Sequence, residues 1–396
     1  MDAAELSTLL TPEGLRLLDS LPPYSSTGAV AQVASLRKAG HSPELVAAVL
    51  TQSRLREKAT AKFGAFADRL LYTQAGLEQA TRLKVAAGHA GRFRSAGVAR
   101  VADLGCGIGA DALALVALEI PVLAVERDEV TAAIASYNLA GFPEAEVVHA
   151  SAEDVDLDGV DAVYLDPARR TAGTTETTRL AREEDYSPSI DFAFGLAERF
   201  PTGIKLGPGF DRSLIPATAE AQWVSVDGQL VEMGLWFGAV ARPGIHRAAL
   251  VLSGAGADEL TAAGDSADAE VRPLGDYVYE PDGAVIRARL IGDLAERLGA
   301  GMLSAGIAYL TADEAVPTPF ATAFRVLERL PAGEAALKRA LRERRIGTLE
   351  IKKRGIDVDP AALRKRLALK GDRSATLILT RVDGGHEALL AERVAG

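Results

Sequence analysis

The stretch that decides the fold is Asp103-Leu104-Gly105-Cys106-Gly107-Ile108-Gly109. It follows a short apolar run at 101–104 and precedes a segment of helical periodicity at 109–118. Glycines allow a sharp backbone turn and let a ligand approach where a Cβ would exclude it. The stretch therefore predicts a ligand-binding loop between a strand and a helix.

The segments after this loop repeat the strand–helix pattern. Short apolar runs predict strands at 122–125, 147–149, 162–165 and 203–206, and helical patterns lie at 128–140 and 189–199. This alternation predicts a parallel sheet covered on both faces, and thus a Rossmann-like α/β domain over residues 96–253. Three further strand-like runs have no helix between them and predict an antiparallel edge, at 222–226, 231–237 and 247–252.

The acid before the glycines indicates which cofactor binds. The glycines are spaced G-x-G-x-G instead of the G-x-G-x-x-G of dinucleotide-binding loops, and Asp103 stands two positions before Gly105. A carboxylate here would repel a pyrophosphate, whereas S-adenosylmethionine has no phosphate and carries a sulfonium and an α-amino group. Asp103, Gly105, Gly107 and Gly109 are therefore predicted to bind S-adenosylmethionine.

Two more positions complete the predicted cofactor pocket. Glu126 ends the second strand, 21 residues after Gly105, where its carboxylate can accept hydrogen bonds from both ribose hydroxyls. After the third strand, Ala152 and Glu153 offer a backbone amide and a carboxylate to the adenine edge, with Asp154 as the alternative to Glu153.

The fourth strand ends in Asp166-Pro167-Ala168-Arg169-Arg170. Ligands of parallel sheets bind beyond the carboxyl ends of the strands, so Asp166 should face the methyl group, and Pro167 restricts it to extended geometry. The segment resembles the D/N-P-P-Y/F motif of methyltransferases that act on base amino groups, and the D-P-P-R variant of some RNA enzymes. Here Arg169 replaces the aromatic residue that stacks on a flipped base, and with Arg170 it is a candidate for binding phosphate. Asp166, Pro167 and Arg169 are the predicted catalytic residues; the alternative is a structural turn with solvated arginines.

For two other side chains near the carboxyl ends of these strands, Lys205 and Tyr186, the sequence leaves two roles open. Lys205, at the end of the fifth strand, either contacts substrate or lies at the sheet edge. Tyr186 either supplies a stacking surface or, as we favour, anchors a loop at the surface. Cys106 is the only cysteine and lies inside the cofactor loop, which excludes an intramolecular disulfide and argues against cysteine-dependent methylation of pyrimidine C5. The five scattered histidines show no metal-ligand spacing, so no metal site is expected.

Composition and charge bound the remaining possibilities. The 396 residues suit two to three domains, no apolar run reaches the ~18 residues of a membrane span, and the acidic start lacks the features of a signal peptide. A cytoplasmic protein without membrane contact is expected. The net charge of −10 is uneven, since residues 332–396 hold 15 Lys and Arg against 9 Asp and Glu, whereas the rest carries −16. The C-terminal segment is therefore where a polyanion would bind.

The flanking segments predict smaller units. Residues 1–95 show helical spacing of leucine and valine. Residues 254–268 are rich in Gly, Ala, Ser and Asp and predict a surface loop or linker. Beyond it, 268–330 predicts a small α+β unit with one helix at 284–298 and strands at 277–279, 307–310 and 322–327. The last unit, 331–396, predicts helices at 334–344 and 360–369 with strands at 348–352 and 375–380.

Together these residues resemble a bacterial family of class I S-adenosylmethionine-dependent methyltransferases with a C-terminal THUMP-like domain. The resemblance covers most of the chain, at 58–64, 71–81, 103–109, 165–170, 279–288, 308–311, 349–355 and 377–381. It implies a ferredoxin-like module at 268–330 and a THUMP-like domain at 331–396. Because THUMP domains bind RNA, usually tRNA, it also implies an RNA methyltransferase. By the same resemblance Thr73, Gln74, Glu78 and Thr81 line the cofactor pocket, unless they form one face of a packed helix.

The leading hypothesis is therefore a methyltransferase that acts on an RNA base without a covalent intermediate, with RNA held at 342–345 and 352–354. A second hypothesis is a methyltransferase of a small molecule or protein. A third is an RNA-binding protein that senses the cofactor without turnover, which the retention of Asp103 and Asp166 disfavours.

Overall fold

The computed structural model describes residues 1–169 and 186–394, except for the side chains of Ala168 and Arg169. The chain forms two compact units. Unit 1 comprises Met1–Leu206 and Leu235–Ala241, and unit 2 comprises Gly207–Gly234 and Arg242–Gly396. Among the described residues, no helix is long and apolar enough to cross a membrane.

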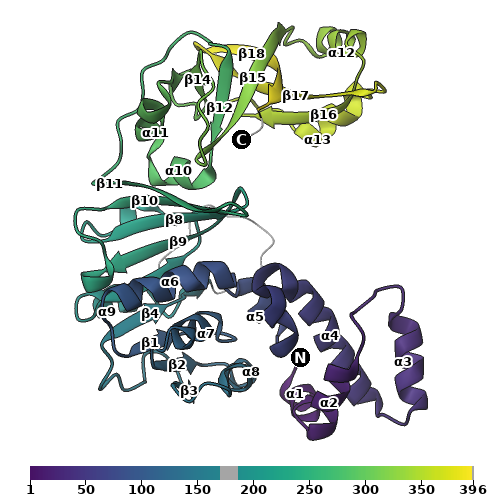
Figure 1. Cartoon of the computed structure of the whole chain (residues 1–396), viewed down its shortest axis with the longest axis vertical. Helices are drawn as coiled ribbons and strands as arrows, with labels where there is room; N and C mark the ends of the chain where they lie inside the picture. The colour runs from purple at the N-terminus through teal and green to yellow at the C-terminus, as the bar shows by residue number, and fades with distance from the viewer. Residues whose placement is uncertain (170–185, 395–396) are drawn as a thin grey trace. The chain divides into compact units, whose positions relative to one another are not determined.

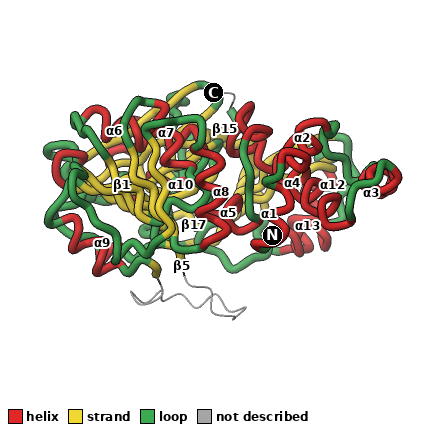
Figure 2. Tube along the Cα trace, turned by 90° about the horizontal axis from the view of Figure 1, so that it is seen from below, coloured by secondary structure: helices red, strands yellow, loops and turns green. Residues whose placement is uncertain are grey.

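The N-terminal part of unit 1 is helical, which confirms the predicted helical segment. Its longest helix, α4, begins where Ser42 accepts a hydrogen bond from the Leu45 amide (3.2 Å) and Pro43 occupies the first turn. The helices pack through a shared core of leucine, valine and phenylalanine side chains, and α1 to α4 lie together beside the strands of unit 1 (Figures 1 and 2). The elements are α1 (Ala3–Leu9), α2 (Pro12–Ser20), α3 (Ala29–Lys38), α4 (Pro43–Phe63), η1 (Gly64–Arg69), α5 (Gln74–Gln79) and α6 (Leu83–Ser95).

The main sheet has nine strands in the order β11-β10-β8-β9-β7-β4-β1-β2-β3. The pairs β3–β2, β2–β1, β1–β4 and β4–β7 are all parallel, and this confirms the predicted Rossmann-like α/β architecture. The strands are β1 (Val101–Leu104), β2 (Val122–Glu126), β3 (Ala145–His149), β4 (Ala162–Leu165), β7 (Thr202–Leu206), β8 (Glu220–Val226), β9 (Gln229–Phe237), β10 (Arg247–Ser253) and β11 (Gly256–Ala262); the helices among them are α7 (Ala110–Ala117), α8 (Glu129–Leu139) and α9 (Ile190–Ala197).

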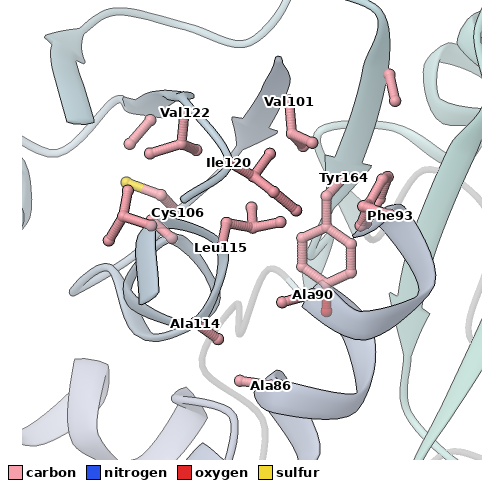
Figure 3. Close-up of a cluster of buried hydrophobic side chains, with 14 of the residues drawn as sticks. Ala86, Ala90, Phe93, Val101, Cys106, Ala114, Leu115, Ile120, Val122 and Tyr164 are labelled. Atoms are coloured by element: carbon pink, nitrogen blue, oxygen red, sulfur yellow. The ribbon is translucent and has the colours of Figure 1, made fainter. Parts of the chain in front are cut away.

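The core of unit 1 lies between the sheet and the helices α6 and α7. Figure 3 shows Ala86, Ala90 and Phe93 of α6 facing Leu115 of α7 and Val101 of β1. Every residue of β1 and β4 is buried, as expected for parallel strands covered on both faces. This packing fixes the carboxyl ends of the strands, where the candidate site lies.

Two predictions about the far edge of the sheet are wrong. β10 pairs with β8 in parallel, so the edge is not wholly antiparallel. Residues 254–268 are not simply a linker, because a tight turn after Ser253 returns the chain and β11 pairs antiparallel with β10. Gly256, with φ +146°, makes this return possible. The sheet therefore continues past residue 253, where the Rossmann-like domain was predicted to end.

Unit 2 contains a second sheet of seven strands in the order β13-β14-β12-β15-β18-β17-β16. It runs across the predicted boundary at residue 330, because β15 pairs with β12 on one side and with β18 on the other. The predicted helix at 284–298 is two helices, since Arg289 adopts a left-handed φ of +59° between them. The elements are β12 (Tyr277–Pro281), α10 (Gly283–Ala288), α11 (Ile291–Leu298), β13 (Gly301–Met302), β14 (Leu310–Ala312), β15 (Ala321–Leu330), α12 (Glu334–Glu343), β16 (Ile346–Lys353), α13 (Pro360–Leu367), β17 (Arg373–Val382) and β18 (Gly385–Arg393), the last of which was not predicted.

Candidate active site

The glycine loop connects β1 to α7 and uses a left-handed backbone at each of its three glycines. The φ angles of Gly105, Gly107 and Gly109 are +91°, +57° and +86°. A Cβ on Gly109 would lie 3.3 Å from the Leu139 side chain, whereas one on Gly107 would meet no atom of the described residues within 4 Å. The loop is thus packed against α8 at its end and open in its middle, where a ligand can approach.

Glu126 ties this loop to the tip of β2. Its Oε2 accepts a hydrogen bond from the Gly107 amide (3.1 Å), and its Oε1 accepts one from the Asp128 amide (2.9 Å). A carboxylate has about four acceptor positions, so both contacts leave capacity for the hydroxyls of a ribose. The structure therefore places Glu126 beside the glycine loop, as its predicted role requires.

Asp103 is a buried carboxylate whose two oxygens accept no hydrogen bond from the described residues. Burial raises the pKa of Asp103, and the negative charges of Asp111 and Asp166 raise it further, whereas the positive charge of Lys205 offsets only part of this rise. Such a group is costly in the absence of a positive partner. A ligand with an ammonium or sulfonium group would relieve this cost, so the site fits S-adenosylmethionine.

The remaining predicted cofactor contacts lie at the ends of β3 and α5. Ala152 is buried, and the exposed Glu153 accepts a hydrogen bond from the Ser151 hydroxyl (2.6 Å). Thr73 caps α5 by accepting a hydrogen bond from the Gly76 amide (2.8 Å), and Glu78 accepts one from the Gln74 side chain. These contacts are local, and a role in cofactor binding stays a prediction for Ala152, Glu153, Thr73 and Glu78.

Helix α5 lies directly against the glycine loop. A Cβ on Gly76 would stand 2.6 Å from the Cγ2 of Ile108 and 2.7 Å from the Oγ1 of Thr73. Lys62 of α4 holds the other end of α5, because its ammonium donates to the carbonyls of Leu77 (2.8 Å) and Ala80 (2.7 Å). The N-terminal helices thereby pack against the glycine loop of the candidate site.

The Asp-Pro motif after β4 lies next to the glycine loop. The position of a Cβ on Gly105 is 3.7 Å from the carbonyl oxygen of Asp166 and 3.9 Å from Pro188. The side chain of Asp166 is partly exposed, and its Oδ2 lies 2.5 Å from the Lys205 ammonium. Of the two readings of Lys205, the structure therefore supports a place in the site, since this lysine contacts the predicted catalytic carboxylate. Pro167 is buried behind it.

The predicted phosphate-binding arginines are only partly described. The backbone of Arg169 belongs to β5 (Ala168–Arg169), which pairs with β6 (Tyr186–Ser187). The Arg169 side chain and Arg170 lie outside the described residues. Tyr186 is 2% exposed, so the expectation of a surface anchor is wrong.

Cys106 is unsuited to nucleophilic catalysis. Its side chain, in the loop that precedes α7, is buried among apolar neighbours (Figure 3). Burial raises the pKa of the Cys106 thiol, and the charges of Asp103 and Glu126 raise it further. The thiolate, which is the reactive form, is therefore disfavoured.

Sequence reasoning missed two buried polar residues behind the site, His89 and Asp111, and named their neighbour Thr81 only as a candidate for the cofactor pocket. Thr81, His89 and Asp111 are each less than a tenth exposed and form hydrogen bonds with one another. Asp111 follows Gly109 by two positions, and that short spacing was the one local signal available. Within the described residues, no group of three or more His, Cys, Asp or Glu side chains is placed to hold a metal ion.

Comparison with known proteins identifies the family. The family model described as THUMP domain-like matches residues 321–393, and a domain of unknown function (DUF8688) matches residues 2–59. A crystal structure of a candidate methyltransferase from Porphyromonas gingivalis W83 has a TM-score of 0.69 at 21% identity and covers 95% of this chain and 100% of that one. At that identity it shows that the fold is shared.

Two curated relatives carry the assignment further. They are named uncharacterized S-adenosylmethionine-dependent methyltransferases of Mycobacterium tuberculosis, strains CDC 1551 and H37Rv, and both are 33% identical over 345 residues. The alignment covers 84% of this chain and 91% of each relative, which confirms the predicted enzyme class and cofactor. The chain thus belongs to a bacterial family of S-adenosylmethionine-dependent methyltransferases that end in a THUMP-like domain.

Proposed function

We propose that this methyltransferase acts on an exocyclic amino group of a base in RNA. The observation that carries the proposal is the position of Asp166. It follows β4 in an Asp-Pro sequence, and its backbone lies beside Gly105 of the glycine loop. A carboxylate at this place is within reach of both a bound cofactor and an incoming base.

For methyl transfer to an amine, the protein has to supply a hydrogen-bond acceptor for that amine. It does not have to supply a nucleophile of its own. S-adenosylmethionine supplies an electrophilic methyl group when bound. Asp166 would accept a hydrogen bond from the base amine and direct the nitrogen lone pair at that methyl group. Asp103, the glycine loop and Glu126 would hold the cofactor, with Ala152, Glu153, Thr73 and Glu78 as further predicted contacts. The buried Cys106 thiol supports a mechanism without a covalent intermediate.

The C-terminal part supports RNA as the substrate. The THUMP-like match lies in the segment where the positive charge of the chain is concentrated. Arg342, Arg345 and Lys370 line a cavity of about 410 Å³, in which Arg345 also pairs with Asp372 (2.6 Å). Exposed guanidinium and ammonium groups around a hollow suit the phosphates of an RNA backbone.

Not every basic residue predicted to hold RNA is available for it. Arg344 pairs with Glu328 (2.5 Å), and Lys352 pairs with Glu280 (2.8 Å). Arg342 and Lys370 form no ion pair with any described residue, so they are the stronger candidates for phosphate contacts.

The test is transfer of a tritiated methyl group to bacterial total RNA and, in parallel, to soluble bacterial protein and metabolites. We expect ribonuclease-sensitive label with the wild type and a loss of about 10²-fold or more with Asp166→Ala. Label confined to protein or small molecules would contradict an RNA substrate. Label in RNA that is unaffected by Asp166→Ala would contradict the role of Asp166.

A further inference from the structure

A line of buried polar side chains leads from Asp166 into the core of unit 1. The Lys205 ammonium lies 2.5 Å from Oδ2 of Asp166 and donates a hydrogen bond to Oγ1 of Thr81 (3.0 Å). The Thr81 hydroxyl in turn donates to Oδ2 of Asp111 (2.6 Å). Thr81 and Asp111 are 4% and 7% exposed, so water competes little for these contacts.

His89 holds the far end of this line. Its Nδ1 lies 2.8 Å from Oδ1 of Asp111 and 3.0 Å from the hydroxyl of Tyr164, a residue of β4. Burial alone would raise the pKa of Asp111, but the hydrogen bond and charge of His89, together with Lys205 and Thr81, lower it overall. Asp111 is therefore ionised at neutral pH.

The arrangement gives the buried Lys205 two anionic neighbours. Asp166 contacts the ammonium directly, and Asp111 acts on it through the Thr81 hydroxyl. Taking an ammonium out of water is costly unless opposite charges and hydrogen bonds compensate it. Lys205 is thus held in one place by groups that belong to different elements of the fold.

These elements are the ones that form the candidate site. Asp111 lies in the first turn of α7, directly after the glycine loop, and Thr81 follows α5. Lys205 lies on β7, and Asp166 follows β4. The line of polar side chains therefore connects the start of α7, the helix after the glycine loop, to Asp166, the carboxylate predicted to contact the substrate.

We propose that Lys205 is a positioning residue that holds the Asp166 carboxylate in its reactive orientation, and that Thr81 and Asp111 hold Lys205. This inference rests on the proposed function, in which Asp166 accepts the hydrogen bond of the substrate amine. A carboxylate has two oxygens and about four acceptor positions, so an ion pair at Oδ2 is compatible with a bond to substrate. Loss of the ion pair removes a contact that fixes the orientation of the carboxylate, and misplacement of about 1 Å costs roughly 10² in rate.

Lys205→Met is the first test, because it removes the charge and keeps an unbranched side chain. We expect kcat for methyl transfer to fall about 10²-fold, while the KM for S-adenosylmethionine changes less than about threefold. Lys84→Met is the matched control, since Lys84 is exposed on α6 and belongs to no part of the site. The control should retain the wild-type kcat.

A pair of substitutions at Thr81 separates positioning from packing. Thr81→Val keeps the shape but removes the hydroxyl between Lys205 and Asp111, so kcat should fall about tenfold. Thr81→Ser removes a methyl group but keeps the hydroxyl, and it should retain most of the activity. Equal losses in both variants, or a loss in Thr81→Ser alone, would overturn the proposal.

Two measurements test the positioning role of Lys205 independently of whether RNA is the substrate. The variants are compared on whichever acceptor of the bacterial extract takes the label, so label in protein would refute an RNA substrate but still measure the positioning effect. Independently, denaturation of Lys205→Met, Asp166→Asn and the double variant gives the coupling between the two side chains. We expect the double variant to lose clearly less stability than the sum of the single losses. Additive losses, or a Lys205→Met enzyme with wild-type kcat, would overturn the proposal.

Discussion

At the scale of single residues, Asp103 shows how a group that we propose to bind the cofactor can oppose the stability of the free protein. Its carboxylate is fully buried and has no hydrogen-bond partner among the described residues. Its pKa is raised in the folded state, so the folded protein binds a proton more readily than the unfolded chain. The contribution of Asp103 to the free energy of unfolding is therefore most favourable at low pH. It becomes less favourable as the pH rises above about 4, the ordinary pKa of an Asp side chain.

Asp103→Asn should consequently stabilise the protein when no cofactor is present. At pH 8 we expect a gain of about 1–3 kcal/mol in the free energy of unfolding, because the wild type on folding must either bury an unpaired carboxylate or take up a proton that the unfolded chain has lost. At pH 4 the gain should shrink, since Asp103 itself is then neutral. Urea denaturation at both pH values measures this, and a variant less stable than the wild type at pH 8 would contradict the account.

The same variant should bind S-adenosylmethionine more weakly. An amide lacks the negative charge that would pair with the ammonium or sulfonium group, so we expect affinity to fall about tenfold or more. Isothermal titration with the cofactor measures the change. Unchanged affinity would mean that Asp103 has no part in binding.

At the residue level, the sequence could indicate which acidic side chains lie at strand ends. Asp103 and Glu126 lie within the last two residues of β1 and β2, Asp166 directly follows β4, and the structure brings these positions to one edge of the sheet. The line from Lys205 through Thr81 to Asp111 could not be predicted, because its contacts join residues 124 and 30 positions apart. Such contacts depend on how helices pack on the sheet, which no local pattern specifies.

At the scale of elements, α5 is a six-residue helix that needs support from its neighbours. Lys62 supplies it by donating to the C-terminal carbonyls of α5. Burial, followed by the positive charges of Lys205 and Arg82, lowers the pKa of Lys62 to about 8. Between pH 8 and the usual lysine range near 10.5, the unfolded chain therefore binds more protons than the folded protein does, so the stability contribution of Lys62 rises with pH.

Lys62→Met should remove this rise. The free energy of unfolding of the wild type minus that of the variant should increase from pH 8 to pH 10. We would measure it by chemical denaturation, with Lys84→Met as the control for loss of an exposed lysine. A difference between wild type and Lys62→Met that is constant or decreasing over this range would contradict the shifted pKa.

The contact of α5 with the glycine loop leads to another prediction. Gly76→Ala would place a methyl group 2.6 Å from Ile108 and force α5 away from the loop. We expect a destabilisation of about 1–3 kcal/mol, together with weaker cofactor binding. Gly88→Ala on α6 is the control, because a Cβ there meets no atom of the described part of the chain within 4 Å. Normal stability and cofactor affinity in Gly76→Ala would show that α5 does not support the loop.

Element prediction worked best for the buried parallel strands and failed at edges. The apolar runs at β1, β2 and β4 are unmistakable because both faces of these strands are covered. β11 was missed because its sequence, Gly-Ala-Asp-Glu-Leu-Thr-Ala, is polar and small, and it forms a strand only by pairing with β10. The break between α10 and α11 was missed because a left-handed arginine carries no sequence signal.

At the scale of the whole molecule, the charge asymmetry predicts how RNA binding responds to salt. Charge reversal in Arg342→Glu/Lys370→Glu should weaken binding to bacterial RNA and reduce the slope of log K against log salt by roughly 0.7–0.9 per lost phosphate contact. Arg37→Glu/Lys38→Glu, on the exposed face of α3, is the matched control. Filter binding at several salt concentrations measures both. An unchanged slope in the Arg342/Lys370 variant would place the RNA elsewhere.

We propose that Asp166 directs a methyl group to an exocyclic amine of an RNA base. The most direct measurement is transfer of a trideuterated methyl group to bacterial RNA, followed by digestion to nucleosides and mass spectrometry. We predict that the wild type places the label on an exocyclic base nitrogen and that Asp166→Ala abolishes this product. Label on a ribose hydroxyl or a ring carbon, or an undiminished product with Asp166→Ala, would contradict the account.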